Sequence, residues 1–530
     1  MVDSYDAIVI GGGPGGSAIS TLLAQAGRKI LLLEREEFPR YHIGESLLSG
    51  TADLLKKLGV LDKMEQARFV KKFGVSWIWG VKRDLWTVYF KDALATPYDF
   101  GYQVERGPFD EMLLNNAREH GVNALERHQV VNLTWDDGRV NGVEYESAAT
   151  GTRTTVEAPW VIDASGQSNF ITRQVATKRW DEKLTNMALW NYWENAHRPD
   201  GIDAGNTFLP TFSEGWWWFI PLRNEITSVG VVLDRENYLA AKKEGMKDYY
   251  LNAIQRTPEL AERLKSAKMI DEMRVLKDWS YTYDQFYGRG FVAVGDAACF
   301  IDPLLSTGVH LAMLSGYLGA ASLNTLLDEP QNEQQILSFY QEQYSREFNR
   351  LKDQIYFLYG GHSSPESYFW HARKTMDMPG ASPKQAFVSL IAGAYEHRSW
   401  YRRFIMNLDV PDQVRKLADG IFTGQASGSQ MVSTDAPLER NPRWQERASF
   451  ALDGLHLRPS TILTSADGNN LPLTPDMSLV LKHIDGSKNS AQLLEEIGEN
   501  DERRNTLRSV LNEAITHGAV VVSKEVAAQV

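Results

Sequence analysis

Three glycines that follow a short apolar run near the start of the chain have the spacing of a nucleotide site. Gly11, Gly13 and Gly16 come directly after the run Asp6 to Ile10, and Glu34 ends the next apolar run. Such glycines let the backbone turn tightly and approach a pyrophosphate, and an acid at the end of the second strand accepts hydrogen bonds from a ribose. The spacing therefore predicts a dinucleotide site.

A second unusual stretch is GWWWFIP, in which three tryptophans stand side by side. Neighbours in an extended chain point to opposite faces, so Trp216 and Trp218 share one face and Trp217 occupies the other. Packing in an apolar core is the simplest role for Trp217. The other two indoles would then form a rigid aromatic wall.

Two more motifs favour FAD over NAD as the nucleotide. The apolar run that starts at Phe291 ends in Gly295-Asp296, and Arg106 stands in VERGPFD. Both stretches resemble the FAD-dependent oxygenases of the p-hydroxybenzoate hydroxylase type, in which the aspartate contacts the ribityl chain and the arginine contacts the flavin. The sequence has no second GxGxxG motif. We therefore expect electrons to come from a separate NAD(P)H-dependent flavin reductase.

Three stretches in unbroken order make the resemblance more specific. They are FPRYHIGESLL (38–48), WWWFIP (216–221) and FIDPLLSTG (300–308). Together they resemble the flavin-dependent halogenases, whose motifs W-x-W-x-I-P and F-x-x-P-x-x-S-x-G both occur here. The resemblance covers roughly the first 350 residues, and three spaced motifs are far more specific than one. The stretch FVKKFGVSWIWG resembles sequences of the branch that acts on phenols, pyrroles or carrier-tethered aromatics rather than on free tryptophan.

The resemblance implies a chemistry for these residues. FADH2, O2 and chloride or bromide would give hypohalous acid at the flavin, and this oxidant would halogenate an electron-rich aromatic ring in natural-product (antibiotic) biosynthesis. The backbone at Ser306, Thr307 and Gly308 would bind the halide through N–H groups, although a turn that merely covers the flavin explains these residues equally well. The indole wall of Trp216 and Trp218 would keep the organic substrate away from the flavin.

Family members guide the oxidant with a lysine, either as a chloramine or as a hydrogen-bond donor, and this chain offers Lys71 and Lys72. Because neighbours in a strand point to opposite faces, only one of them can face the site. We prefer Lys72, which stands two residues before Gly74 as in the family pattern, and Lys71 remains the alternative. We also predict that Arg40 and Ser46 bind the cofactor. Glu45 has a simpler role as an acid at the start of a helix over 46–58.

The alternative function is aromatic hydroxylation by an FAD-dependent monooxygenase, because the fold and the cofactor motifs are shared. The indole wall and the F-x-x-P-x-x-S-x-G stretch count against it. The expected partners are the flavin reductase and a small aromatic substrate, either free or attached to a carrier protein.

The elements that would position these residues follow the order strand, glycine turn, helix, strand, which is an α/β pattern. We expect a Rossmann-type FAD-binding domain (glutathione reductase/p-hydroxybenzoate hydroxylase-like) at 1–330, with an interleaved substrate sheet at about 73–102 and 181–277. A mostly helical C-terminal region follows. It divides into a helical cap over the substrate site at 331–426, a linker at 427–448 and a small winged-helix-like unit at 449–530. Within that last unit the pattern predicts helices at 477–484, 490–497 and 504–517 and a strand at 519–522.

Composition sets the remaining limits. The 530 residues carry a net charge of -12, so no basic surface is expected for nucleic acid or for an anionic membrane. The single cysteine, Cys299, excludes a disulfide within the chain and a thiolate metal cluster, and we predict no metal site. No stretch of 18 uninterrupted apolar residues and no signal peptide are apparent, so the expected location is the cytoplasm.

Overall fold

The structure is a computed structural model of the chain. It describes residues 4–79, 83–93, 98–360, 382–393, 436–466 and 470–522. Two compact units make up the chain. The first comprises residues 1–376 and 383–394, and the second comprises residues 377–382 and 395–530. None of the described helices is both long and apolar enough to cross a lipid bilayer.

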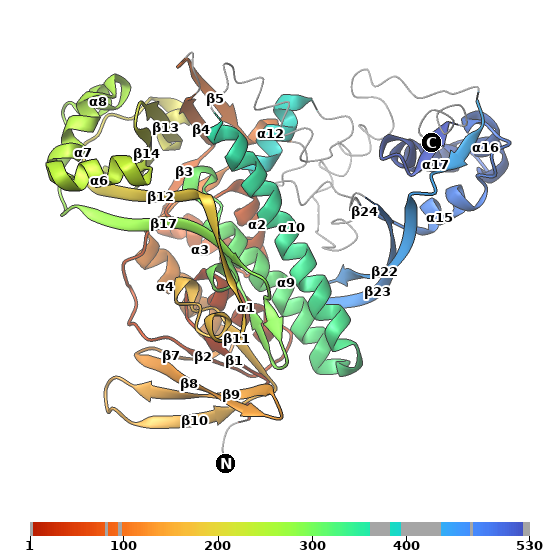
Figure 1. Cartoon of the computed structure of the whole chain (residues 1–530), viewed down its shortest axis with the longest axis horizontal. Coiled ribbons are helices and arrows are strands. Elements are labelled where there is room, and N and C mark those ends of the chain that lie inside the picture. Colours follow the sequence, from red (N-terminus) through yellow and green to blue (C-terminus); the bar gives the residue numbers. More distant parts are fainter. Residues whose placement is uncertain are drawn as a thin grey trace. The chain divides into compact units, whose positions relative to one another are not determined.

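The half of the first unit that carries the glycine turn is built on a six-stranded sheet (Figure 1). Its strand order is β18-β19-β11-β1-β2-β7, and all pairs are parallel except β18 with β19. Every residue of β1 and β2 is buried, as expected for parallel strands covered on both faces. The strands are β1 (Ala7–Ile10), β2 (Ile30–Leu33), β7 (Asn123–Leu125), β11 (Trp160–Asp163), β18 (Tyr287–Gly288) and β19 (Phe291–Ala293).

A second sheet of nine strands carries the tryptophan run. Its strand order is β20-β17-β12-β15-β14-β13-β4-β5, with β16 paired to β12. The strands are β4 (Gly74–Ile78), β5 (Leu85–Tyr89), β12 (Lys178–Glu194), β13 (Thr207–Phe212), β14 (Gly215–Pro221), β15 (Ile226–Leu233), β16 (Lys268–Met269), β17 (Arg274–Tyr283) and β20 (Cys299–Phe300). The chain thus leaves the first sheet and returns to it, which is the interleaved arrangement that the sequence predicts.

Helices cover both sheets. One face of the nine-stranded sheet packs against α6 (Arg235–Glu244), α7 (Met246–Gln255) and α8 (Pro258–Leu264). The other helices of this unit are α1 (Pro14–Gln25), α2 (Ser49–Lys57), α3 (Leu61–Ala67), α4 (Arg106–Glu119), α5 (Thr172–Val175), α9 (Gly308–Asp328), α10 (Glu333–Tyr359) and α12 (Pro383–Ile391). The last two fall within the predicted helical cap, and residues 361–381 and 394–426 of that prediction lie outside the described residues.

Small sheets complete the first unit. Strands β8 (His128–Asp136), β9 (Arg139–Ser147) and β10 (Arg153–Glu157) form an antiparallel sheet that shares a core with β1 and β2. Strands β3 (Val70–Lys72) and β6 (Gly101–Gln103) pair antiparallel. This last pair matters for function because it holds both candidate lysines.

The second unit has its own apolar core. It contains β21 (Leu438–Arg440), β22 (Trp444–Asp453), β23 (His456–Ser465), β24 (Asn470–Pro472), α15 (Pro475–Lys482), α16 (Ser490–Ile497), α17 (Asp501–Thr516) and β25 (Val520–Val522). Strand β21 and the start of β22 occupy the described part of the predicted linker, and β21 is held there by pairing with β25. The three helices and the last strand match the predicted elements closely.

Candidate active site

The glycine turn fits a diphosphate. Gly11 has a φ of 104°, and a Cβ atom on it would lie 2.5 Å from the carbonyl oxygen of Ala164. A Cβ atom on Gly16 would lie 2.0 Å from the carbonyl oxygen of Gly11. Only glycine therefore permits both the turn and the packing of α1 on it. Gly13 is the N-cap residue of α1 and offers no side chain to the first N–H groups, so these groups remain available to an anion.

Two charged residues flank this turn. The buried carboxylate of Glu34 accepts hydrogen bonds from the N–H groups of Gly12 (2.7 Å) and Glu36 (2.9 Å). Arg40 pairs with Asp110 at 3.2 Å, and its Nη2 would lie 3.4 Å from a Cβ atom on Gly13. An acid near the position expected for a ribose and a cation beside the position expected for the phosphates are thus both present, and this arrangement fits an adenine dinucleotide.

Arg106 and Asp296 continue the site toward the second sheet. Arg106 is buried at the start of α4, where its guanidinium binds both oxygens of Asp110 (2.7 and 2.9 Å) and the carbonyl oxygen of Ile43 (2.7 Å). Asp296 follows Gly295, whose φ is 60°. Burial raises the pKa of Asp296 to about 7, and Arg106 opposes this shift. Among the described residues no hydrogen bond reaches the Asp296 carboxyl oxygens, so they are available to ribityl hydroxyls. These residues fit FAD.

The loop predicted to bind halide ends at the start of a long helix. A 3-10 turn over Pro303–Leu305 leads to Ser306 with a φ of 57°, and Thr307 is the N-cap residue of α9. The Thr307 hydroxyl is fully buried, has no hydrogen-bond partner among the described residues and does not cap the helix. A Cβ atom on Gly308 would meet no atom of the described residues within 4 Å. An open space thus borders backbone N–H groups and a helix N-terminus, which is a suitable environment for an anion.

The tryptophan run divides as predicted. Trp217 is fully buried in the core shared with α6–α8, where its Nε1 donates to Thr257. Trp216 and Trp218 lie on the other face with ring centroids 6.4 Å apart. The role of Trp217 as a core residue is confirmed, and the other two indoles form a continuous aromatic surface.

The structure adds two tryptophans to this wall that the sequence analysis missed. The ring centroid of Trp79 lies 6.1 Å from that of Trp216, and the ring centroid of Trp190 lies 6.2 Å from that of Trp218. Gly230 pairs with both Trp190 and Trp218 in the sheet, and a Cβ atom on it would lie 2.1 Å from the Trp218 ring. A glycine in the middle of an apolar strand was the available signal, because such a glycine often marks a close approach.

The two candidate lysines have opposite environments on β3. Lys71 is partly exposed, pairs with Glu65 at 2.9 Å and lies over the Phe100 ring. Lys72 is fully buried, and its Nζ donates to the Ser46 hydroxyl at 2.8 Å. Burial lowers the pKa of Lys72 to about 7. Ser46, which we predicted as a cofactor ligand, thus directs its hydroxyl to Lys72 and, at 3.1 Å, to Thr207.

Glu45 is not the helix-start acid that the sequence suggested. Helix α2 begins only at Ser49, because Ser46 forms a β-bridge with Gln103. The Glu45 carboxyl is buried and accepts a hydrogen bond from the Tyr192 hydroxyl at 2.8 Å. Burial raises its pKa to about 7, against the opposing effects of the Ser228 and Tyr192 hydroxyls. No local signal predicts this environment, since Tyr192 and Ser228 are distant in sequence.

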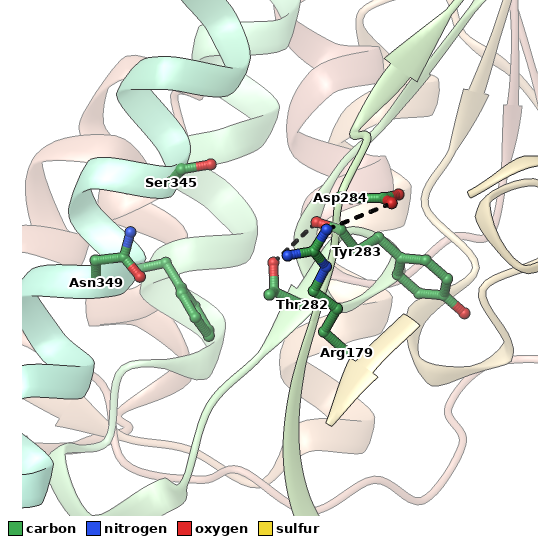
Figure 2. A pocket seen from close by; sticks show the side chains of 7 residues that line it. Arg179, Thr282, Tyr283, Asp284, Ser345 and Asn349 are labelled. Carbon is green, nitrogen blue, oxygen red and sulfur yellow. Dashed lines mark hydrogen bonds and ion pairs between the residues drawn. The ribbon is translucent and has the colours of Figure 1, made fainter. Parts of the chain in front are cut away.

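The first unit contains one cavity beside this site and another away from it. One, of about 370 Å³, is lined by Arg40, Glu45 and Arg106 together with Tyr41, Tyr192 and Arg274, among others. It lies beside the predicted cofactor residues. The other, of about 290 Å³, lies between α10 and the strands β12 and β17. Figure 2 shows Ser345 and Asn349 across it from Arg179, which is 3.9 Å from Asp284. None of the predicted site residues lines this second cavity.

The fold and the site together define an FAD-dependent enzyme of the p-hydroxybenzoate hydroxylase-like class. A family model described as tryptophan halogenase matches residues 6–96 and 91–421. The chain is 34% identical over 406 residues to a tryptophan 2-halogenase of Chondromyces crocatus, which covers 75% of this chain and 77% of that protein. It therefore belongs to the tryptophan halogenase family and is a flavin-dependent halogenase.

Two further likenesses agree with this assignment. A 1H-pyrrole-2-carbonyl-[peptidyl-carrier protein] chlorinase of Pseudomonas fluorescens is 30% identical over 343 residues, which make up 60% of this chain and 75% of that protein. The solved structure of the myxobacterial chondrochloren halogenase CndH is 35% identical, with a TM-score of 0.67 over 86% of this chain and all of that one. Enzymes of this family use FADH2 and a halide, and a separate reductase supplies the reduced flavin.

Proposed function

We propose that the chain forms hypohalous acid from O2 and chloride or bromide at the flavin, and that Lys72 then directs the halogen to an electron-rich aromatic ring. The residues that would hold FAD are the glycine turn with Glu34, Arg40, Arg106 and Asp296. Bound as FADH2, the flavin would supply two electrons to O2 and the halide two more, so that with one proton from solvent the products would be hypohalous acid, water and FAD. Ser306–Gly308 would hold the halide.

The observation that carries this proposal is the burial of the Lys72 amine. A shift of its pKa from 10.5 to about 7 corresponds to about 5 kcal/mol of unfavourable interaction with the protonated amine. Among the described residues no carboxylate pairs with it, and its hydrogen-bond partner is the Ser46 hydroxyl. A methionine would fill the same space without this cost. Packing alone therefore does not account for a lysine here, whereas a reacting amine does.

The same pKa suits both roles that family members give to this lysine. Near neutral pH the amine populates its neutral and protonated forms about equally. The neutral form has a lone pair that can take the halogen from hypohalous acid, and the protonated form can donate a hydrogen bond to the oxidant's oxygen. Lys71 is less suited because it is partly exposed and paired with Glu65.

The flavin region and Lys72 are linked by two adjacent residues. Glu45 lines the cavity that Arg106 also lines, and Ser46 contacts Lys72. The indole of Trp218 donates to the Ser228 hydroxyl, and Trp216 is linked to the loop at Asp302 through Tyr359. These two indoles would stop a large ring from reaching the flavin while a small oxidant passes. This separation supports halogenation in place of direct oxygen transfer.

For the substrate we propose a phenol, tyrosine-like or pyrrole ring, free or attached to a carrier protein. Similarity to a carrier-dependent pyrrole chlorinase supports this class. The similarity to a tryptophan 2-halogenase makes tryptophan the necessary comparison in any assay.

The test is to incubate the full chain with flavin reductase, NADH, FAD, O2 and chloride or bromide, and to offer phenols, pyrrole-2-carboxylate free and carrier-bound, and tryptophan. Mass spectrometry should show the halogen isotope pattern on a phenol or pyrrole. Lys72→Ala should abolish this product, and Lys71→Ala should retain it. Halogenation of tryptophan alone would refute the substrate class. Full activity of Lys72→Ala, or oxygenated products only, would refute the mechanism.

A further inference from the structure

The hydroxyl of Tyr359, the last residue of α10, connects three parts of the molecule. It accepts hydrogen bonds from the Trp216 indole Nε1 (2.7 Å) and from the Asn186 amide (3.0 Å). It donates its own proton to Oδ2 of Asp302 at 2.9 Å. A phenol hydroxyl has one proton and two acceptor lone pairs. These three bonds therefore use its full hydrogen-bonding capacity.

Asp302 is equally fixed. It is fully buried, its Oδ2 also accepts from Asn186 (3.0 Å), and its Oδ1 accepts from the N–H of Leu304 (3.0 Å). Its own N–H donates to the Ser280 hydroxyl (2.9 Å). Asp302 caps the turn that leads directly into Ser306–Gly308. Tyr359 thus joins the wall to the loop proposed to bind halide.

A second indole binds the same end of α10. Trp79 donates from Nε1 to the carbonyl oxygen of Leu358 at 2.8 Å. Its ring contacts the Tyr359 ring edge-to-face at 6.3 Å and lies 6.1 Å from Trp216. The last turn of α10 is therefore held by indoles from both β14 and the end of β4.

We propose that Tyr359 is a positioning residue that fixes the Trp216 indole against the loop Asp302–Gly308 and so sets the width of the passage at the wall. This inference rests on the proposed function, because it assumes that the wall separates the oxidant's origin from the substrate. Without the hydroxyl, the Trp216 N–H loses its acceptor and the indole can turn away from the loop. Oxidant would then escape before it reaches Lys72.

Tyr359→Phe in the full-length enzyme tests this inference with little risk to folding, because the ring and its packing on Trp79 are kept. The first readout needs no cofactor: in ¹H–¹⁵N spectra the Trp216 indole N–H signal, identified by its loss in Trp216→Phe, should move upfield. The second readout is the ratio of trapped free hypohalous acid to halogenated product. Of the three hydrogen bonds that the variant loses, the one from Trp216 orients the indole; its loss, worth about 1 kcal/mol, should raise that ratio about fivefold.

Tyr356→Phe is a matched control. Tyr356 lies one turn earlier on the same helix, and its hydroxyl donates to Asp181 instead of contacting the wall. This variant should leave the Trp216 signal and the ratio as in the wild type.

The inference fails if Tyr359→Phe leaves either readout unchanged, or if Tyr356→Phe changes both to the same extent. These outcomes differ from failure of the proposed function, which would appear as full activity in Lys72→Ala whatever Tyr359 does.

Discussion

Replacing Lys72 with methionine should stabilise the first unit, and the gain should shrink as the pH rises. Burial lowers the Lys72 pKa from 10.5 to about 7. Between these two values the unfolded chain holds a proton that the folded chain lacks, so folding becomes more favourable with rising pH. Below pH 7 both states are protonated, and the folded state bears the whole cost of the buried charge.

The size of the effect follows from the two pKa values. The cost to the folded state is about 4 kcal/mol at pH 7 and about 2 kcal/mol at pH 9. Methionine has a similar length and no charge, so the Lys72→Met variant avoids this cost at both pH values. The difference in free energy of unfolding between the variant and the wild type should therefore fall by about 2 kcal/mol from pH 7 to pH 9.

The assay is urea unfolding of both proteins at pH 7 and pH 9, followed by tryptophan fluorescence, because most tryptophans lie in the first unit. The same preparations should be tested for halogenation, which Lys72→Met should lose while it gains stability. Lys71→Met is the control, since Lys71 is partly exposed and paired with Glu65. A difference between Lys72→Met and wild type that does not vary with pH would refute the reasoning.

Three other perturbations have defined outcomes. Burial raises the Glu45 pKa from 4.5 to about 7, so wild-type stability should fall by about 3 kcal/mol relative to Glu45→Gln as the pH rises from 4 to 8, measured by urea unfolding. Gly230→Ala places a Cβ atom 2.1 Å from the Trp218 ring; it should cost about 1–3 kcal/mol and lower halogenation, while a flavin titration stays normal. Gly16→Ala places a Cβ atom 2.0 Å from the Gly11 carbonyl oxygen and should weaken FAD binding, measured by flavin fluorescence, at least tenfold, or about 1.4 kcal/mol. Unchanged binding in that variant would contradict the proposed cofactor site.

Much of the local structure could be predicted because it depends on neighbours in the chain. The turn between β1 and α1 could be predicted because closely spaced glycines after a short apolar strand are typical of this turn and of few other structures. Helix α16 has the predicted bounds, Ser490–Ile497, because Asn489 and Gln492 form a capping box that is readable in the sequence. The two faces of β14 follow from strand alternation.

Other features could not be predicted, because their causes lie far away in sequence. Strand alternation shows that Lys71 and Lys72 face opposite ways, but not which of them is buried. The predicted role of Glu45 was wrong because Ser46 forms a β-bridge with Gln103, so that α2 begins only at Ser49. That bridge is a long-range contact, which the local sequence does not reveal.

The sequence alone determined the class of cofactor, the interleaved α/β architecture and the order of motifs that identifies a halogenase, since these reside in short patterns of residue type. Tertiary structure alone decided the electrostatics of the site. Surrounding side chains exclude water from the Lys72 amine, and the Trp216 indole donates a hydrogen bond to Tyr359, which lies 143 residues later in the chain. Solvent exclusion and hydrogen bonds between distant segments set a pKa and an orientation, and neither is encoded in any one stretch of the chain.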